Sequence, residues 1–227
     1  MKRVSLNILG LILTWIVWLW LIGQELELTY AFGIAVGGIL VIIPVVFVGR
    51  RLLDRQPTIE QADLLTTILH YLVAIFLGSA VIAATKFGLS SPSWSISIPS
   101  WMGLVLMIVG GISVLIVILN LAIKGLGAPF AVALTRIVAT EWMYAWTRNP
   151  MILGALAFLV GLGLWFKSTL FLVWVIILVC PVIFLFLKVY EERELEIRFG
   201  EDYLKYKAGT PMFIPRKPGD KPNGGAV

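Results

Sequence analysis

Long apolar runs separated by short polar segments dominate the sequence. Each run approaches the ~20 residues that an α-helix needs to cross the ~30 Å core of a bilayer. The runs cover residues 6–22, 29–48, 64–84, 101–122, 151–166 and 169–187. They predict an all-α integral membrane protein with about six transmembrane helices. The helical pattern continues to Phe199, and Gly200 is a typical helix stop, so we expect a cytosolic C-terminal helical extension.

The composition supports a membrane protein and excludes several kinds of site. The chain is 59% hydrophobic and 14% charged, and it contains one cysteine, Cys180, and one histidine, His70. One cysteine forms no disulfide within the chain and one histidine forms no multi-histidine metal site, so we expect no metal. The net charge of +5 fits the cytoplasmic bias of Lys and Arg in membrane proteins, so we expect no nucleic-acid partner.

The basic residues also predict which connections share a side of the membrane. They gather at the N-terminus, in residues 50–55, in residues 123–149 and in the C-terminal tail. The intervening connections hold only Lys86 and Lys167. The positive-inside rule makes the basic side cytoplasmic. We therefore expect both termini in the cytoplasm, the bacterial inner membrane as the location, and both ends of the hairpin 150–187 on the cytoplasmic side.

The hairpin begins with polar residues that suit an anion. Pro150 fits the first helical position because it has no amide hydrogen to lose there, and Asn149 fits the N-cap. A helix N-terminus attracts anionic groups, and the planar guanidinium of Arg148 suits a carboxylate. Gly154, one turn further on, lets a ligand or another helix approach the backbone. An ordinary capped membrane helix with a basic flank accounts for the same residues.

The hairpin ends with Glu191 and Glu192, beyond which the predicted helix continues. A carboxylate at the membrane edge accepts hydrogen bonds from ribose hydroxyls or from an ammonium group. Glu191, Glu194 and Arg198 share one side of this helix at helical spacing. A solvated, salt-bridged helix surface explains these charges equally well. The aromatic segment that follows, with Tyr203 and Tyr206, either folds back over the hairpin ends or lies in the interface.

The two ends together resemble a known superfamily. The segment Arg148-Asn149-Pro150-Met151-x-x-Gly154, followed after the hairpin by Glu191-Glu192, resembles the isoprenylcysteine carboxyl methyltransferases and phospholipid methyltransferases. Three flanking segments agree with the same family: Gly125-Leu126-Gly127-Ala128-Pro129, Phe199-Gly200-x-x-Tyr203 and Ile214-Pro215-Arg216. The resemblance covers about residues 125–216.

The resemblance implies an integral membrane enzyme that binds S-adenosylmethionine on the cytosolic side and takes its substrate from the membrane. It implies catalytic roles for Arg148 and Glu191. The cofactor-binding residues that it implies are Tyr144, Arg148, Asn149, Pro150, Gly154, Glu191, Glu192 and Tyr203. The chain then divides into a four-helix transmembrane scaffold (1–122), a methyltransferase-like region with the hairpin (123–216) and a flexible tail (217–227).

Two functions remain open at this point. One is an S-adenosylmethionine-dependent methyltransferase with a lipophilic acceptor, namely a prenylcysteine-like carboxylate, a lipid amine or a thiol. Because the sulfonium methyl is already activated, such a transfer depends mostly on positioning. The other is a non-catalytic membrane protein, such as a transporter subunit, that keeps the methyltransferase fold.

His70 is the candidate residue on the substrate side. An ionisable side chain within a membrane span usually faces a cavity or the bundle interior and is a functional candidate. His70 lies about two turns into the third predicted span, near the expected depth of the cofactor site. A neutral imidazole accepts a hydrogen bond or a proton from an amine or thiol. The structural alternative is a histidine bonded to Thr66 or Thr67, one turn back.

Overall fold

The computed structural model describes residues 2–89, 95–123 and 137–217 of the chain. Helices form the regular structure of this part, in which an isolated β-bridge joins Ser95 and Ser168. The all-α prediction is therefore confirmed. Three segments that carried predictions lie outside the described residues: the motif at residues 125–129, the basic residues Lys124 and Arg136, and the tail beyond Lys217.

Each predicted apolar run lies in a helix. The helices before the last one are α1 (Lys2–Gly23), α2 (Leu28–Arg55), α3 (Ile59–Leu89), α4 (Ser100–Ile123), the 3₁₀ helix η2 (Trp142–Ala145) and α5 (Pro150–Trp165). Helix α2 continues seven residues past the predicted end at Val48 and stops at Arg55. It stops there because Pro57 disfavours a helical conformation at Gln56, whose φ is −140°. The oxygen Oγ1 of Thr58 then accepts a hydrogen bond from the Gln61 amide at the start of α3.

Five helices of the described chain are long and apolar enough to cross a membrane. They are Val4–Gly23, Leu28–Arg55, Ile59–Gly88, Ser100–Ile123 and Thr169–Phe199. The sixth predicted span is the shorter apolar helix Pro150–Trp165, which has 16 residues. The structure thus supports an integral membrane protein, while the count of six spans is not confirmed.

The last long helix, Thr169–Phe199, is not a regular α-helix. We call it the C-terminal helix. Its parts are α6 (Thr169–Trp174), the π-helical turn η3 (Val175–Val179), α7 (Cys180–Leu185), the π-helical turn η4 (Phe186–Glu191) and α8 (Glu192–Phe199). Helix α2 supports both π turns from one side. The Trp174 indole donates a hydrogen bond to the Ala35 carbonyl before η3, and Arg50 Nη1 donates to the Val189 carbonyl within η4.

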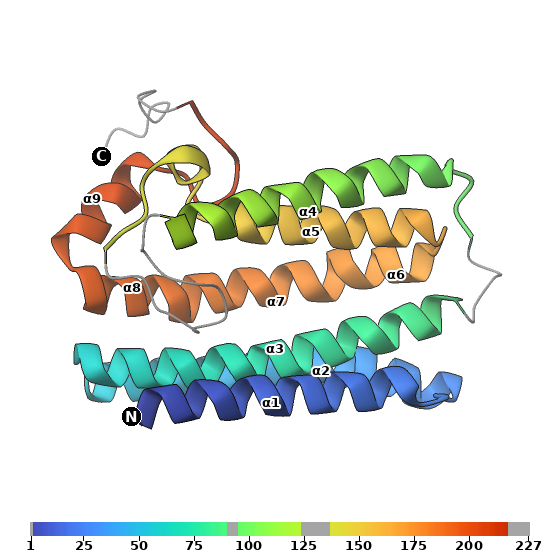
Figure 1. The fold of residues 1–227 in the computed structure, drawn as a ribbon, viewed down its shortest axis with the longest axis horizontal. Coiled ribbons are helices and arrows are strands. Elements are labelled where there is room, and N and C mark those ends of the chain that lie inside the picture. Colours follow the sequence, from blue (N-terminus) through green and yellow to red (C-terminus); the bar gives the residue numbers. More distant parts are fainter. Residues whose placement is uncertain (1, 90–94, 124–136, 218–227) are drawn as a thin grey trace.

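The C-terminal helix occupies the centre of the bundle. Figure 1 shows α1, α2 and α3 on one side of it and the pair α4 and α5 on the other. Fully buried aliphatic residues of α2, such as Ile39 and Val46, pack against Val175 and Tyr190 of the C-terminal helix. The core therefore lies between α2, α3 and the C-terminal helix.

Helices α4 and α5 pack through glycines. An added Cβ at Gly110 would lie 2.6 Å from the Gly154 carbonyl oxygen, and one at Gly161 would lie 2.6 Å from the Met107 amide nitrogen. The two backbones are thus in direct contact, as small residues permit between membrane helices. Helix α4, which we had grouped with the N-terminal scaffold, packs along the hairpin helix α5.

The connections group at the two ends of the bundle in the predicted way (Figure 1). At one end, Lys86 Nζ donates hydrogen bonds to the carbonyls of Ile22 and Gln24, and the Ile96 amide donates to the Lys167 carbonyl. The start of α1, the α2–α3 connection, η2 and helices α8 and α9 (Glu201–Gly209) lie at the opposite end. Both ends of the hairpin therefore face the same way, as the sequence predicts.

Candidate active site

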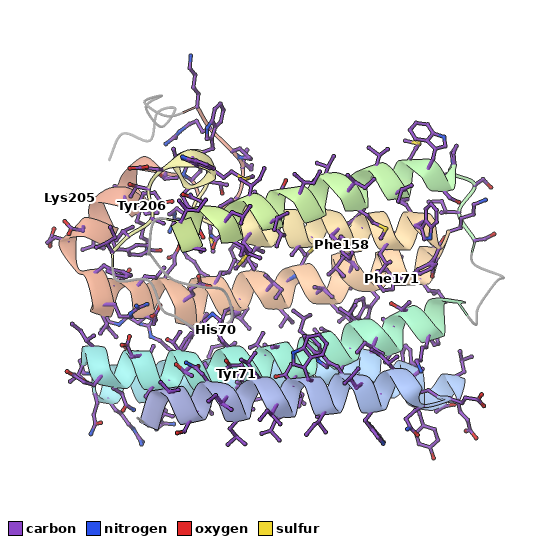
Figure 2. All side chains as sticks on the ribbon, viewed as in Figure 1. His70, Tyr71, Phe158, Phe171, Lys205 and Tyr206 are labelled. Carbon is purple, nitrogen blue, oxygen red and sulfur yellow. The ribbon has the colours of Figure 1, made fainter. Side chains whose placement is uncertain are left out.

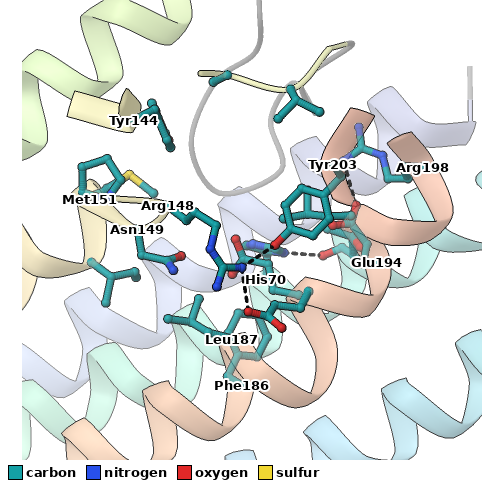
Figure 3. A pocket seen from close by; sticks show the side chains of 18 of the residues that line it. His70, Tyr144, Arg148, Asn149, Met151, Phe186, Leu187, Glu194, Arg198 and Tyr203 are labelled. Carbon is teal, nitrogen blue, oxygen red and sulfur yellow. Dashed lines mark hydrogen bonds and ion pairs between the residues drawn. The ribbon is translucent and has the colours of Figure 1, made fainter. Parts of the chain in front are cut away.

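One cavity lies where α5 begins and the C-terminal helix passes into α8. Its volume is about 280 Å³. Its lining comes from α3, from Leu121 of α4, from residues 138–152 and from the stretch between Ile183 and Tyr206 (Figure 3). The polar lining residues include Thr66, His70, Tyr144, Arg148, Asn149, Glu191, Glu192, Glu194, Arg198, Tyr203 and Tyr206. The two polar ends of the hairpin thus line one cavity, although Arg148 and Glu192 are 44 residues apart in sequence.

Arg148 joins the two ends directly. Its Nη1 donates a hydrogen bond of 2.7 Å to Glu192 Oε1 and one of 3.2 Å to the Tyr203 hydroxyl. Its Nε donates to the Thr210 carbonyl oxygen at 3.0 Å. The side chains of Arg148 and Glu192 are only 10% and 7% exposed. A charge-assisted pair with so little water around it holds its geometry closely.

Both carboxylate oxygens of Glu192 pair with basic side chains of the protein. Its Oε2 lies 2.8 Å from Lys207 Nζ and 3.4 Å from Lys188 Nζ, while Oε1 takes the Arg148 bond. Burial acts to lower the pKa of Lys207, but its hydrogen bonds to Glu192 and Glu196 outweigh this and raise the pKa above its usual value. Glu192 therefore clamps α8 to α5 and α9.

Glu191 differs from its neighbour. It lines the cavity and is half-buried, and within the described part of the chain it makes no hydrogen bond or ion pair. It closes the π turn η4, in which the Glu192 amide donates to the Leu187 carbonyl, one residue further back than in an α-helix. One extra residue in a turn shifts all later side chains by ~100° around the helix axis. Adjacent residues of a helix also point ~100° apart, so the two glutamates meet different surroundings.

The residues after α9 fold back over the start of α5. The Arg148 amide donates to the Pro211 carbonyl, the Thr147 hydroxyl to the Met212 carbonyl and the Arg216 amide to the Trp146 carbonyl. Asn149 is the residue before α5, as predicted, but its side chain does not cap the helix. Its Nδ2 instead donates to the Met212 carbonyl at 3.1 Å, because the returning segment offers an acceptor there.

Gly154 lies outside the lining of this cavity. An added Cβ there would meet the Gly110 carbonyl oxygen at 3.0 Å and side chains of Val114 and Ser113 on α4. The sequence allows either a ligand or another helix to approach the backbone at Gly154, and in the structure the helix α4 does so. Pro150, by contrast, is buried at the first position of α5 and lines the cavity.

Three tyrosines cover the cavity from the side of η2 and α9. The Tyr206 hydroxyl donates a 2.7 Å hydrogen bond to the Tyr144 carbonyl. The Tyr203 hydroxyl accepts the bond from Arg148 (Figure 3). Burial, followed by the charge of Glu191, raises the pKa of Tyr144 above its usual range. Burial likewise raises the pKa values of Tyr203 and Tyr206. All three phenols therefore stay neutral and able to donate hydrogen bonds.

Part of this chain is similar to one known protein family. The family model described as phospholipid methyltransferase matches residues 98–202. Over these residues the chain is similar to phospholipid methyltransferases. No curated protein and no solved structure matches it. The match covers less than half of the chain, which also holds helices long enough to cross a membrane.

The residues that the family model matches contain most of the polar lining. Arg148, Asn149, Glu191 and Glu192 lie within the matched residues, as does α4. Tyr203 and Tyr206 follow the matched range directly, whereas the lining residues of α3 precede it by about thirty residues or less. The cavity therefore combines residues that match the family model with a wall from the N-terminal part of the chain.

His70 belongs to that N-terminal wall. Figure 2 shows it on the side of α3 that faces the C-terminal helix, whereas its neighbour Tyr71 faces α1. The ring of His70 packs edge-on against Phe186 at a centroid distance of 5.7 Å. Its Nδ1 lies 2.8 Å from the Thr66 carbonyl oxygen. His70 thus lines the same cavity as Arg148 and Glu191, and its bond goes to the backbone of Thr66, one of the two threonines named in the structural alternative.

A second ion-pair network lies beside the first. Arg198 Nη1 binds Glu194 Oε1 at 2.7 Å, and Arg198 Nε binds Asp63 Oδ1 at 3.0 Å. The predicted shared side of Glu194 and Arg198 is thus confirmed. The sequence reasoning did not include Asp63, or the 3.1 Å hydrogen bond between Thr66 Oγ1 and the Tyr190 hydroxyl. Both link α3 to the C-terminal helix, and only packing reveals such partners.

Proposed function

We propose that this protein transfers the methyl group of S-adenosylmethionine to a lipophilic acceptor that reaches the cavity from the membrane. One observation carries the proposal. Arg148 and Glu191, from opposite ends of the hairpin, line a single cavity whose other wall is the apolar face of a membrane-length helix. The cavity's volume of about 280 Å³ is near the lower end of the ~300–1,000 Å³ usual for ligand sites.

The polar half of the cavity fits the polar parts of the cofactor. S-adenosylmethionine supplies an activated methyl on a sulfonium sulfur, and it carries ribose hydroxyls, an ammonium and a carboxylate. The carboxylate of Glu191, without a partner in the described fold, accepts hydrogen bonds from hydroxyls or the ammonium group. Nη2 of Arg148 makes no hydrogen bond within the described residues, so it is available to a carboxylate beside the start of α5.

The apolar half fits the acceptor. Val73, Ala74 and Leu77 of α3 line it, opposite Ile183 and Phe186 of the C-terminal helix. These residues lie within helices that are long enough to span a membrane. A hydrocarbon chain gains about 25 cal/mol for each Å² of its surface buried there instead of in water. The acceptor classes are a lipid amine, a thiol and a prenylcysteine-like carboxylate, and the family description makes a phospholipid amine the first to test.

The proposed roles follow from these contacts. Arg148 orients the cofactor's carboxylate and holds the hairpin ends together, Glu191 binds its hydroxyls or ammonium, and the tyrosines shield the site from water. Transfer then depends chiefly on placing the acceptor atom in line with the methyl carbon. We also propose that this end of the bundle faces the cytoplasm, because most Lys and Arg residues lie there.

Binding of S-adenosylmethionine tests the proposal most directly. We expect the purified protein in detergent to bind it in a calorimetric titration. Glu191→Gln should weaken binding about tenfold, which corresponds to ~1.4 kcal/mol for a charged hydrogen bond. The melting temperature should not fall, because Glu191 holds no partner in the described fold.

Glu201→Gln is the matched control, because Glu201 is exposed on α9 and outside the cavity lining. It should bind S-adenosylmethionine as the wild type does. Equal affinities of the two variants would move the cofactor away from Glu191, and a wild type that binds none would contradict the proposed function. Methyl transfer to phosphatidylethanolamine, with phosphatidylcholine as the blank, then tests the acceptor class.

A further inference from the structure

The hydrogen bond of His70 determines which of its ring nitrogens carries hydrogen. Nδ1 lies 2.8 Å from the Thr66 carbonyl oxygen, and a carbonyl only accepts. Nδ1 must therefore donate, and in the neutral ring Nε2 keeps a free lone pair. Within the described residues Nε2 has no hydrogen-bond partner, and the ring lines the cavity. His70 thus presents Nε2 to the cavity as an atom that can accept a hydrogen bond or a proton.

His70 stands at the boundary between the two halves of the cavity. Along α3 the lining passes from Thr66 and His70 to Val73, Ala74 and Leu77. The polar end adjoins Glu194 and Arg198 of α8, and the apolar end faces residues of the C-terminal helix within the span. An amphiphilic molecule whose chain lies along the apolar end has its head group beside His70.

Contacts with Phe186 and Thr66 hold the His70 ring in place. Its ring packs edge-on against Phe186, and Thr66, whose carbonyl accepts the Nδ1 bond, is 1% exposed. The Thr66 hydroxyl in turn bonds the Tyr190 hydroxyl on the C-terminal helix at 3.1 Å. The imidazole is therefore fixed in direction, which a residue that must meet one atom of a substrate requires. His70 precedes the matched family domain, so the family match gives it no role.

We propose that Nε2 of His70 accepts the proton of a methyl acceptor whose attacking atom is a nitrogen or sulfur that carries hydrogen. The inference rests on the proposed function. The acceptor's nitrogen or sulfur bonds to the methyl carbon, the bond from that carbon to the sulfonium sulfur breaks, and its electron pair stays on that sulfur. The N–H or S–H proton passes to Nε2, and the imidazolium later releases it to water. A carboxylate acceptor needs no such base.

The single histidine allows a test that does not depend on turnover. With ¹⁵N-labelled histidine, the protein in phosphatidylcholine nanodiscs gives the two ring-nitrogen signals of His70 alone. We expect Nδ1 protonated and Nε2 bare. With S-adenosylhomocysteine present, added phosphatidylethanolamine (amine arm) or a long-chain alkanethiol (thiol arm) should shift the Nε2 signal. Hydrogen on Nε2 in the free protein, or no shift in either arm, would overturn the proposal.

Two variants separate the roles of the ring nitrogens in turnover. His70→Asn keeps a donor near the Nδ1 position but removes the base, and His70→Gln offers an acceptor oxygen near Nε2 that takes up no proton. Both should lower kcat about 100-fold or more with the acceptor that shifts the signal, as expected for loss of a general base. The affinity for S-adenosylmethionine and the melting temperature should stay unchanged in His70→Asn.

Tyr71→Phe is the matched control. Tyr71 faces α1, and its hydroxyl has no hydrogen-bond partner in the described chain, so its loss should leave kcat unchanged. Full activity of His70→Asn in a protein that binds S-adenosylmethionine would overturn the His70 proposal alone. A wild type that neither binds S-adenosylmethionine nor transfers methyl would overturn the proposed function and this inference together.

Discussion

The polar and apolar halves of the cavity are held in different ways. In the polar half, Glu192 accepts bonds from Arg148 at 2.7 Å and from Lys207 at 2.8 Å, which ties the start of α5, α8 and α9 together. In the apolar half, Val73, Ala74 and Leu77 offer only van der Waals contact from α3. A cross-linked wall suits a ligand with fixed polar groups, whereas an apolar wall tolerates chains of varying shape. The difference fits the two ligands that we propose, an invariant cofactor and a variable lipophilic acceptor.

The largest expected effect comes from breaking the polar half. Arg148→Ala should abolish detectable S-adenosylmethionine binding and destabilise the protein by ~3 kcal/mol, because it leaves the Glu192 carboxylate buried without its closest partner. Adding Glu192→Gln to this variant should restore part of the stability without restoring binding. Thermal unfolding and calorimetric titration of the two single variants and the double variant measure both quantities. Fully additive losses of stability would show that the pair is not coupled.

An intermediate effect comes from filling the apolar half. Leu77→Trp adds bulk to the α3 wall, away from the ion pairs, and should raise KM for the lipophilic acceptor about tenfold. The affinity for S-adenosylmethionine should not change. Leu64→Trp is the control, because Leu64 is exposed on the same helix and does not line the cavity. A loss of cofactor affinity in Leu77→Trp would place the cofactor deeper than we propose.

The smallest expected effect comes from the support behind the polar half. Arg50 Nη1 donates a 3.0 Å hydrogen bond to the Val189 carbonyl within the π turn that ends at Glu191. Arg50→Ala should cost ~1 kcal/mol of stability and weaken S-adenosylmethionine binding a few-fold. Arg51→Ala, one residue on at an exposed position, should change neither. Complete loss of binding in Arg50→Ala, as expected for Arg148→Ala, would make the π turn as important to the site as the ion pair.

Several residues show why the sequence predicts where helices form better than it predicts which distant residues contact one another. The apolar runs predicted each membrane helix, because hydrophobic length is a local property of the chain. Gly154 was predicted to admit a ligand or a helix, and only the packing of α4 decides between them. Asn149 occupies the predicted N-cap position, yet its side chain bonds the Met212 carbonyl, 63 residues away, which no local pattern indicates.

The sequence by itself determined the all-helical membrane architecture and placed both ends of the hairpin on one side. It did so because span length and reversal of direction depend only on the order of apolar and polar residues. The tertiary structure decided that Glu192 is clamped while Glu191 faces the cavity, and that His70 directs Nε2 into it. A π turn shifts later side chains by ~100°, and contacts between distant helices then determine which charge finds a partner.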